Sequence, residues 1–315
     1  MAGIKKILIV RLSSFGDIIL TFPLINILKN KFPQSHISFV VKDKYADLVE
    51  LNPKVDEVIN YYTDGGEDLK TALKSAGYEV VLDLQNNPRS RILTNGLKNV
   101  HRFRKDNFKK FLLVKFKINK LEDAEPVCKR YIRTAAEAFE IGDDEMMFTP
   151  SEISTDTAKN PDKSYVVVAP SSRHFTKTYP KEKYAEYIKS NPDTKFVLVG
   201  DDSEEDKEIC STIENETNNT INLCGQLSYA ELAGIIGGSD HVICNDSGIL
   251  HLAEAMGKKV VAIFGSTVKE FGFFPQLKES LVYEIEGLKC RPCSHIGLPS
   301  CPLGHFKCMN EIELE

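Results

Sequence analysis

Short hydrophobic runs alternate with amphipathic helical stretches along most of this chain. In the first half, the runs predict strands at Ile7–Val10, Ile37–Val41, Val55–Tyr61 and Val80–Leu84. In the second half, they predict strands at Tyr165–Ala169, Lys195–Val199, Thr220–Leu223, His241–Cys244 and Val260–Phe264. Such alternation is typical of βαβ units around a parallel sheet, so the chain is expected to have an α/β fold.

The alternation lapses once, in a polar stretch from Thr149 to Lys163 that contains Pro150 and Pro161. Pro-containing polar stretches between periodic segments are typical of linkers. A chain of 315 residues also suits two domains of roughly 150 residues each. The sequence therefore predicts two successive Rossmann-like domains, residues 1–160 and 161–315. In open sheets of this kind, ligands bind beyond the carboxyl ends of the strands, so ligand-binding residues are expected in the strand-to-helix loops.

Composition narrows the function classes. Hydrophobic residues at 42% and charged residues at 27% are ordinary globular values. The net charge of −5 argues against a dedicated nucleic-acid binder, whose surface is usually basic. No segment approaches the ~20 apolar residues of a membrane span. The run Ile7–Val10 is interrupted by Arg11, which indicates a strand and disfavours a signal peptide, so a cytoplasmic protein is expected.

Residues 98–120 stand out by charge, because they carry nine Lys and Arg residues and a single acid, Asp106. One interpretation is the solvated face of a helix. The alternative is a surface that binds an anionic acceptor or an anionic membrane.

The loop after the first strand contains Ser13, Gly16 and Asp17 and leads into the apolar stretch Ile18–Leu28. Small residues let the backbone approach a ligand, and a helix N-terminus presents free N–H groups to an anion. The G-x-G-x-x-G dinucleotide fingerprint is absent. Asp17 either stabilises the helix dipole without a further role or serves as a general base.

A second segment follows the strand His241–Cys244, with Asp246, Ser247, Gly248 and His251 in order. Ser247 can cap the next helix, and Gly248 lets a phosphate reach backbone N–H groups. His251 lies one helical turn beyond Ser247, so both can face one ligand. The alternative is an ordinary helix cap with an unrelated histidine.

A third segment follows the strand Tyr165–Ala169. Ser171 and Ser172 can hydrogen-bond a phosphate, and Lys177 can neutralise one. After the next strand, Asp202 can accept hydrogen bonds from ribose hydroxyls, with Glu204 nearly as well placed. By themselves, these residues also fit a hydroxyl-rich turn and an acid-decorated helix N-terminus.

Together, these segments resemble the family 9 glycosyltransferases, the ADP-heptose:lipopolysaccharide heptosyltransferases. The first match is Arg11–Leu24 with Ser13, Ser14, Gly16, Asp17 and Pro23. The second is the Lys177-x-Tyr179-Pro180 step preceded by Ser171-Ser172, and the third is Asp246-Ser247-Gly248 with His251. The matches occur in the order of the family, with the predicted linker between the first and the second.

The resemblance implies a GT-B fold, two Rossmann-like domains facing each other across a cleft, with the last helix packed back on the N-terminal domain. It implies inverting transfer of a heptose or related sugar from an ADP-sugar to an anionic lipopolysaccharide-type acceptor at the inner-membrane surface, with no catalytic metal or other cofactor. Asp17 would be the base, and Ser13 and Gly16 of the same loop would bind the donor. The donor would be bound by Ser171, Ser172, Lys177, Asp202, Asp246, Ser247, Gly248 and His251.

Two other functions fit the same segments. A different donor, such as a UDP-sugar, would use the same fold and base. A binding module for adenine nucleotides would use the fold without catalysis, but such a module needs no acid at Asp17.

The C-terminal region gathers half of the eight cysteines, in the pattern Cys290-x₂-Cys293-x₇-Cys301-x₆-Cys308. Four thiolates can hold a structural Zn²⁺ ion, and the first pair has a suitable spacing. Free thiols, disulfides and a redox role are the alternatives. The other four, Cys128, Cys210, Cys224 and Cys244, are expected to be small core residues.

Overall fold

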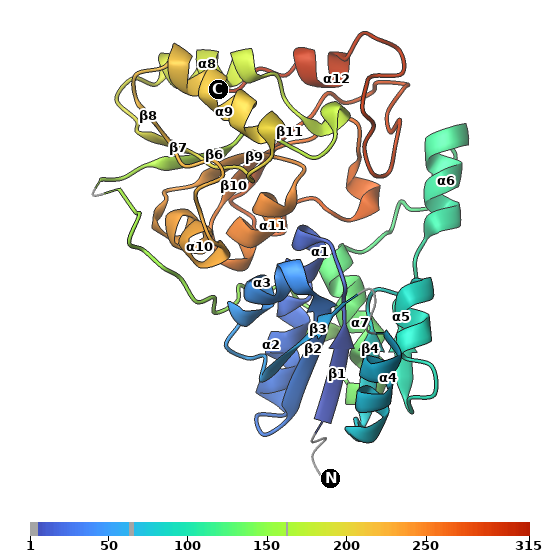
Figure 1. Ribbon diagram of the computed structural model, residues 1–315. Coiled ribbons are helices and arrows are strands. Elements are labelled where there is room, and N and C mark those ends of the chain that lie inside the picture. Colours follow the sequence, from blue (N-terminus) through green and yellow to red (C-terminus); the bar gives the residue numbers. More distant parts are fainter. Residues whose placement is uncertain (1–5, 63–65, 162) are drawn as a thin grey trace. The chain divides into compact units, whose positions relative to one another are not determined.

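Two parallel sheets organise the chain (Figure 1), each within its own compact unit. This computed structural model describes residues 6–62, 66–161 and 163–315. Residues 1–105 and 127–154 form the first unit, and residues 106–126 and 155–315 form the second. The expected architecture of two Rossmann-like α/β domains is confirmed. The observed division differs from the expected 1–160 and 161–315, because residues 106–126 and 155–160 belong to the second unit.

The first unit contains a five-stranded parallel sheet of order β3-β2-β1-β4-β5. Its strands are β1 (Lys6–Val10), β2 (His36–Lys42), β3 (Glu57–Tyr61), β4 (Val80–Asp83) and β5 (Val100–Arg102). Its helices are α1 (Phe15–Ile19), α2 (Phe22–Lys31), α3 (Ala46–Glu50), α4 (Gly66–Ser75), α5 (Pro88–Leu93) and α7 (Val127–Phe139). The strand order reverses between β1 and β4, which makes the space beyond their carboxyl ends the switch point of this sheet.

The second unit contains a six-stranded parallel sheet of order β11-β10-β9-β6-β7-β8. Its strands are β6 (Val166–Ala169), β7 (Phe196–Leu198), β8 (Thr220–Asn222), β9 (Val242–Asn245), β10 (Val260–Ile263) and β11 (Leu281–Tyr283). Its helices are α6 (Asn107–Phe116), α8 (Lys181–Ser190), α9 (Glu204–Glu216), α10 (Tyr229–Gly238), α11 (Gly248–Ala255) and α12 (Lys307–Asn310). Here the order reverses between β6 and β9.

Burial of both sheet faces explains why the central strands read as continuous apolar runs. Ile7, Leu8, Ile9 and Val10 are all fully buried, as expected for parallel strands covered by helices on both sides. Alternate residues point to opposite faces, so Leu8 and Val10 share one core cluster with residues of α4 and α5. In the second sheet, Figure 1 shows α8 and α9 on one side and α10 and α11 on the other.

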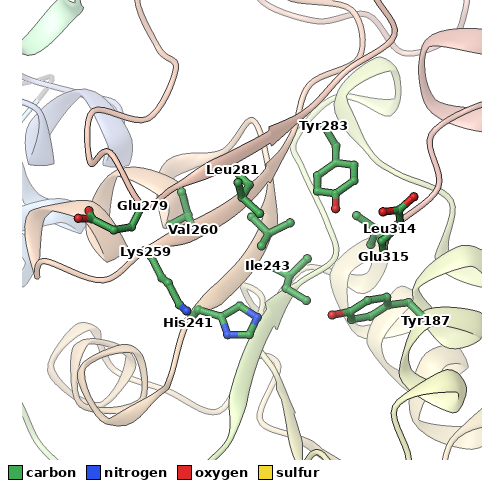
Figure 2. Close-up of a pocket in the computed structure, with 11 residues that line it drawn as sticks. Tyr187, His241, Ile243, Lys259, Val260, Glu279, Leu281, Tyr283, Leu314 and Glu315 are labelled. Carbon is green, nitrogen blue, oxygen red and sulfur yellow. The ribbon is translucent and has the colours of Figure 1, made fainter.

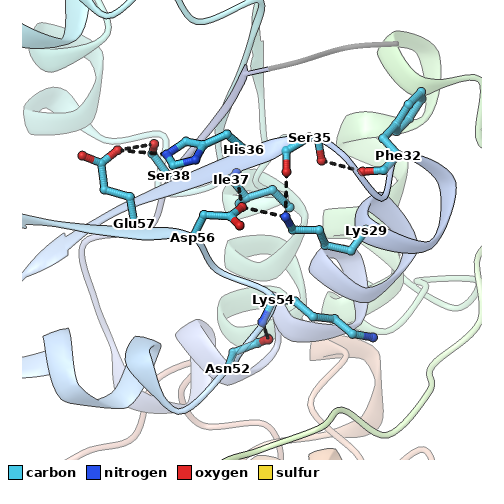
Figure 3. Close-up of polar contacts among 10 residues, drawn as sticks. All are labelled: Lys29, Phe32, Ser35, His36, Ile37, Ser38, Asn52, Lys54, Asp56 and Glu57. Atoms are coloured by element: carbon cyan, nitrogen blue, oxygen red, sulfur yellow. Dashed lines mark hydrogen bonds and ion pairs between the residues drawn. The ribbon is translucent and has the colours of Figure 1, made fainter.

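A polar network fixes the start of β3 beside β2 (Figure 3). The Asp56 carboxylate accepts the Ile37 N–H at 2.7 Å and pairs with the Lys29 ammonium at 2.7 Å. Lys29 also donates to the Ser35 carbonyl at 2.6 Å. The loop between α2 and β2 is therefore joined to the chain that enters β3, which supports the register between these strands.

Two short strands, β5 and β11, were not predicted, whereas the equally short β7 and β8 were. β5 and β11 have only three residues each, and β5 lies inside the basic run 98–120, which also contains α6. The expected linker forms no helix or strand in its described residues. Cys308 and Met309 of the last helix, α12, lie in the core of the second unit, and the expected packing of this helix on the N-terminal domain stays a prediction. Within the described ranges, no helix has the length and apolar character needed to cross a bilayer.

Gly234 of α10 lets the linker pack against the second unit. A Cβ atom at Gly234 would lie 1.8 Å from the Asp156 carbonyl oxygen. The Asp156 N–H donates to the Ala230 carbonyl at 2.9 Å, and the Asn160 side chain donates to the Gly234 carbonyl at 3.0 Å. The absence of a side chain at Gly234 thus permits a backbone contact that no other residue allows.

We expect Gly234→Ala to lower the free energy of unfolding by about 1–3 kcal/mol, because the new methyl group forces the linker away from α10. Gly237→Ala is the matched control in the same helix, since its Cβ would meet only the mobile end of Met256 at 3.1 Å. Urea unfolding of both variants measures the difference. Equal midpoints for the two variants would contradict the proposed close packing.

Candidate functional site

In the first unit, the loops after β1 and β4 are joined at the switch point. The Gln85 side-chain oxygen accepts the N–H groups of Leu12 at 2.9 Å and Ser13 at 3.2 Å. Arg11 donates to the Leu84 carbonyl at 2.9 Å. These bonds hold the loop that carries Ser13 and Gly16. Gln85 was not predicted as a site residue, although its place directly after a strand is the kind of signal that marks such residues.

Asp17 lies in the first turn of α1 and is held from two directions. Its carboxylate pairs with the Arg11 guanidinium at 2.7 Å and accepts the Ser14 hydroxyl at 2.8 Å. The Tyr131 hydroxyl of α7 donates to the other carboxylate oxygen at 3.3 Å. The Asp17 side chain remains 23% exposed, so a substrate can reach it. Buried Arg11 and Tyr131 thus hold the Asp17 carboxylate in addition to its place at the start of α1, and its role as a base stays a prediction.

Burial affects the pKa values of two groups around Asp17. Arg11 and Tyr131 are almost completely buried, and the guanidinium lies 5.6 Å from the centre of the tyrosine ring. Burial raises the pKa of Tyr131 far above its usual value, so the hydroxyl stays a hydrogen-bond donor. Burial opposes the charge of Arg11, but its contacts with Tyr131 and Asp17 raise the pKa of Arg11 overall. Tyr131 lies in mid-helix, where no sequence signal marks it.

In the second unit, the buried side chain of Asn245 joins the loops at the switch point between β6 and β9. Its amide nitrogen donates to the Pro170 carbonyl at 2.8 Å, and its oxygen accepts the Tyr179 N–H at 3.0 Å. The two ends of the segment that carries Ser171, Ser172 and Lys177 are thereby attached to the end of β9. Asn245 is a second positioning residue that the sequence did not single out.

Lys177 and Asp246 were predicted as site residues in two different segments, and in the structure their side chains form an ion pair. The ammonium lies 2.7 Å from the carboxylate, with side-chain exposures of 15% and 6%. The Thr267 hydroxyl donates to the same carboxylate oxygen at 2.5 Å. A cation at the carboxyl ends of β6 and β9 is thus held in place before any ligand binds. Thr267, in the loop after β10, is another residue that sequence reasoning missed.

The N-terminus of α11 lies next to this pair. Gly248 is the first residue of the helix, and Ser247 is its N-cap. The Ser247 hydroxyl is buried and has no hydrogen-bond partner among the described residues, and the Ser266 hydroxyl is in the same situation. Unsatisfied buried hydroxyls beside a helix N-terminus fit an anionic ligand. His251 is buried further along the helix, with its ring 5.9 Å from that of Phe273.

The acids after β7 differ in exposure. Asp202 and Glu204 are exposed, whereas Asp206 lies closer to the predicted donor loop. The Asp206 carboxylate accepts the Asp201 N–H at 2.9 Å. Burial raises the pKa of Asp206, and a hydrogen bond from Ser171 lowers it. The hydroxyl of Ser171 is therefore directed to Asp206, and a role for Asp202 stays a prediction.

The cysteine-rich segment supports the loops that carry Lys177 and Thr267. Leu298 and Thr176 are joined by two hydrogen bonds, one of 3.1 Å between main-chain groups and one of 2.8 Å to the threonine hydroxyl. The Arg291 guanidinium donates to the Thr267 carbonyl at 2.7 Å and pairs with Glu284 at 2.6 Å. The cysteine-rich segment therefore supports both loops through its hydrogen bonds to Thr176 and Thr267.

The structure does not support the structural zinc site at Cys290, Cys293, Cys301 and Cys308. No group of three or more His, Cys, Asp or Glu residues could hold a metal ion in the described parts of the chain. All four cysteines are free thiols. Cys308 is part of the hydrophobic core of the second unit, and Cys301 packs against that core. These two sulfur atoms fill apolar space in the core.

A separate pocket of about 270 Å³ lies elsewhere in the second unit (Figure 2). Figure 2 shows Tyr187, Tyr283 and Glu315 on one side and His241 and Lys259 on the other. His241 and Lys259 directly precede β9 and β10, so the pocket extends toward the amino ends of these strands. The predicted donor residues lie at the carboxyl ends, and none of them lines it.

Comparison with known proteins gives a consistent result. Residues 67–300 match Glycosyltransferase family 9 (heptosyltransferase). The sequence is 26% identical to Lipopolysaccharide heptosyltransferase 1 of Campylobacter coli over 288 residues, which cover 83% of this chain and 84% of that protein.

Solved structures agree on the fold. The E. coli ADP-heptose LPS heptosyltransferase II aligns with a TM-score of 0.72 and 19% identity, covering 97% of this chain and 98% of that one. The E. coli heptosyltransferase WaaC with ADP aligns with a TM-score of 0.69 and 18% identity, covering 88% and 92%. These likenesses confirm the GT-B fold that the sequence predicted.

One buried acid of α11 makes a pH prediction possible. Glu254 is 2% exposed, and its carboxyl accepts the N–H groups of Gln276 at 2.6 Å and Leu277 at 2.8 Å. Burial raises the pKa of Glu254 from the ordinary 4.5 to about 7. Between these values the folded protein binds a proton that the unfolded chain has lost. The contribution to stability is therefore present below pH 4.5 and is lost as the pH rises through about 7.

We expect Glu254→Gln to remove this pH dependence, because glutamine stays neutral and keeps an oxygen that accepts both N–H groups. Urea unfolding of wild type and variant from about pH 5 to about pH 8 tests this through linkage. The stability of the wild type relative to the variant should fall across this interval. Glu279→Gln, which alters an exposed acid of the same unit, is the control. Parallel pH profiles for wild type and Glu254→Gln would refute the buried-proton assignment.

Proposed function

Since this chain belongs to glycosyltransferase family 9, the heptosyltransferase family, we propose that it transfers a heptose or closely related sugar from an ADP-sugar to a lipopolysaccharide-type acceptor. It is therefore a glycosyltransferase. One observation carries the proposal for the donor. The side chains of Lys177, Asp246 and Ser247 lie together at the carboxyl ends of β6 and β9, and the Ser247 hydroxyl has no hydrogen-bond partner among the described residues. A cation and a helix N-terminus are what a diphosphate requires.

The donor residues have separate roles in this proposal. Lys177 and Ser172 contact the diphosphate, together with the N-terminus of α11 at Gly248. The Ser171 hydroxyl leaves Asp206 or shares its hydrogen bond when the diphosphate arrives. The buried hydroxyl of Ser247, which has no hydrogen-bond partner among the described residues, donates to a phosphate oxygen.

The other predicted donor residues are two acids, Asp246 and Asp202, and one histidine, His251. Asp246, already oriented by Lys177 and Thr267, accepts hydrogen bonds from the sugar hydroxyls. Asp202 lies at the ribose side, where its exposure leaves it available. His251 supports the helix that faces the phosphates. The solved E. coli relative with ADP supports adenosine as the nucleoside.

Asp17 is the catalytic base in this mechanism. It removes the proton from the acceptor hydroxyl as the oxygen of that hydroxyl forms a bond with the anomeric carbon. The bond between this carbon and the diphosphate oxygen breaks, and the electron pair leaves with ADP. Attack from the face opposite the leaving group inverts the anomeric configuration. Ser13 and Gly16 of the same loop contact the donor, and Arg11 holds the Asp17 carboxylate.

Charge stabilisation at the leaving diphosphate comes from protein groups in this proposal. Lys177 neutralises the developing charge, and the N–H groups of α11 donate to the phosphate oxygens. These groups take the place that a metal ion occupies in other transferases, so we propose metal-independent transfer. Asp17 belongs to the first unit and Lys177 to the second.

The acceptor is proposed to be an anionic glycolipid on the inner face of the cytoplasmic membrane. The Campylobacter coli relative is a lipopolysaccharide heptosyltransferase by name. The basic run 98–120 supports an anionic partner, since positive charge raises the local concentration of anions.

We expect Asp17→Asn to reduce sugar transfer by at least ~10²-fold, the lower range for loss of a general base. The amide keeps an oxygen for Arg11, so folding should be retained. ADP release from ADP-heptose in the presence of a heptose-deficient lipopolysaccharide core measures the rate. Asp47→Asn changes another acid in the first turn of a helix and should retain the wild-type rate. Transfer by Asp17→Asn at the Asp47→Asn rate would remove Asp17 from the mechanism.

We expect Lys177→Gln to weaken ADP binding by ~10-fold or more, as charge-assisted hydrogen bonds to phosphate are strong. Adenosine affinity should stay unchanged, because adenosine has no diphosphate. Calorimetry with ADP, UDP and adenosine measures this, after thermal unfolding shows that the variant is folded. Lys181→Gln is the control. Equal ADP affinity in wild type and Lys177→Gln would reject the proposal that Lys177 binds the diphosphate. A higher affinity of the wild type for UDP than for ADP would contradict an ADP-sugar as the donor.

A further inference from the structure

Helix α6 presents an apolar face to solvent. Phe108 is 71% exposed, Phe111 51% and Phe116 57%. Spacings of three and eight residues place these rings on one side of the helix. Ile118, just past the end of the helix, is 47% exposed. Several large apolar side chains exposed together on one short segment mark an interaction surface.

The opposite face of α6 is already occupied. Leu113 is buried in a cluster with Leu121 and Phe271 of the second unit. The Lys110 ammonium lies 5.5 Å from the centre of the Phe271 ring. Beyond the helix, the Lys117 ammonium donates to the Pro292 carbonyl at 2.6 Å. The helix is thus fixed on its own unit by one face, and its exposed phenylalanines belong to the other face.

Positive charge surrounds the exposed rings. Lys109, Lys115 and Lys120 are all exposed, and residues 107–120 contain no acid. The acids that border this stretch are Asp106, which lies 4.0 Å from the Lys109 ammonium, Glu122 and Asp123, and Glu270, which accepts the Asn119 side-chain amide at 3.0 Å. An occupant of this surface must therefore accept aromatic rings and offer negative charge around them.

We propose that α6 is an interfacial helix that docks this protein on an anionic lipid bilayer. Phenylalanines enter the region between headgroups and acyl chains, while the lysines contact phosphate groups of the lipids. A second copy of the chain fits this surface poorly, because a two-fold contact would place the same lysines opposite one another. The inference deepens the proposed function, on which it rests for a lipid-linked acceptor.

Co-sedimentation with vesicles tests the proposal without donor or acceptor. Wild type should bind vesicles of phosphatidylcholine with phosphatidylglycerol and bind pure phosphatidylcholine more weakly. The triple variant Phe108→Ser, Phe111→Ser, Phe116→Ser should bind the mixed vesicles ~10²-fold more weakly, given the apolar area that it loses. Leu281→Ser, which alters an exposed apolar residue of the same unit (56%), should bind as wild type does.

The lysines are tested in the same assay. Lys109→Gln, Lys115→Gln and Lys120→Gln together should reduce binding to the mixed vesicles by roughly 10²-fold. The control removes the same charge at Lys163, Lys189 and Lys278, which are also exposed in this unit. Equal losses for both lysine sets would show a general charge effect and overturn the assignment to α6.

Further outcomes separate this proposal from the proposed function. The phenylalanine variant should keep its unfolding temperature and its rate with a delipidated acceptor, but lose rate with an acceptor in vesicles. Absence of vesicle binding by the wild type would overturn the docking surface. A dimeric wild type together with a monomeric phenylalanine variant would also overturn it, because the exposed rings would then form a protein–protein interface. Vesicle binding through α6 without any transfer from ADP-heptose would instead refute the proposed function and leave the docking surface standing.

Discussion

A buried side-chain amide at each switch point is the interaction on which both parts of the candidate site depend. At a switch point the connections from two neighbouring strands leave in opposite directions, so no backbone ladder joins their loops. In the second unit, Asn245 donates to the loop after β6 and accepts from the end of the lysine loop. In the first, Gln85 accepts two N–H groups of the loop that leads to Asp17. An amide suits this task because it carries both donors and an acceptor.

The charged residues at these loops are arranged as compact pairs. Arg11 and Asp17 lie 2.7 Å apart, as do Lys177 and Asp246. Removing such groups from water is costly, and buried pairs are a weak source of stability. In the proposed mechanism, they hold a carboxylate oriented for proton transfer and an ammonium oriented for a diphosphate. Because the orientation exists before substrates bind, little reorganisation is needed during the reaction.

Segments distant in sequence complete the second unit. The inserted stretch 106–126 meets the cysteine-rich segment through Lys117, whose ammonium donates to the Cys290 and Pro292 carbonyls. The cysteine-rich segment in turn supports Thr176 and Thr267. Changes at either stretch can thus reach the lysine loop through a chain of hydrogen bonds, although neither stretch contains a predicted donor residue.

The sequence by itself determined the two parallel sheets, their main strands and the loops that carry Asp17, Lys177 and Ser247. Strand periodicity is a local property, and in a parallel sheet the carboxyl ends of the strands mark the ligand side wherever they occur. Only the tertiary structure paired Lys177 with Asp246, directed Ser171 to Asp206, placed Tyr131 at Asp17 and assigned residues 106–126 to the second unit. The tertiary structure also revealed the three-residue strands β5 and β11, which the sequence pattern did not predict. These features depend on neighbours distant in the chain, and the stability of such short strands comes from the sheet that they join rather than from their own residues.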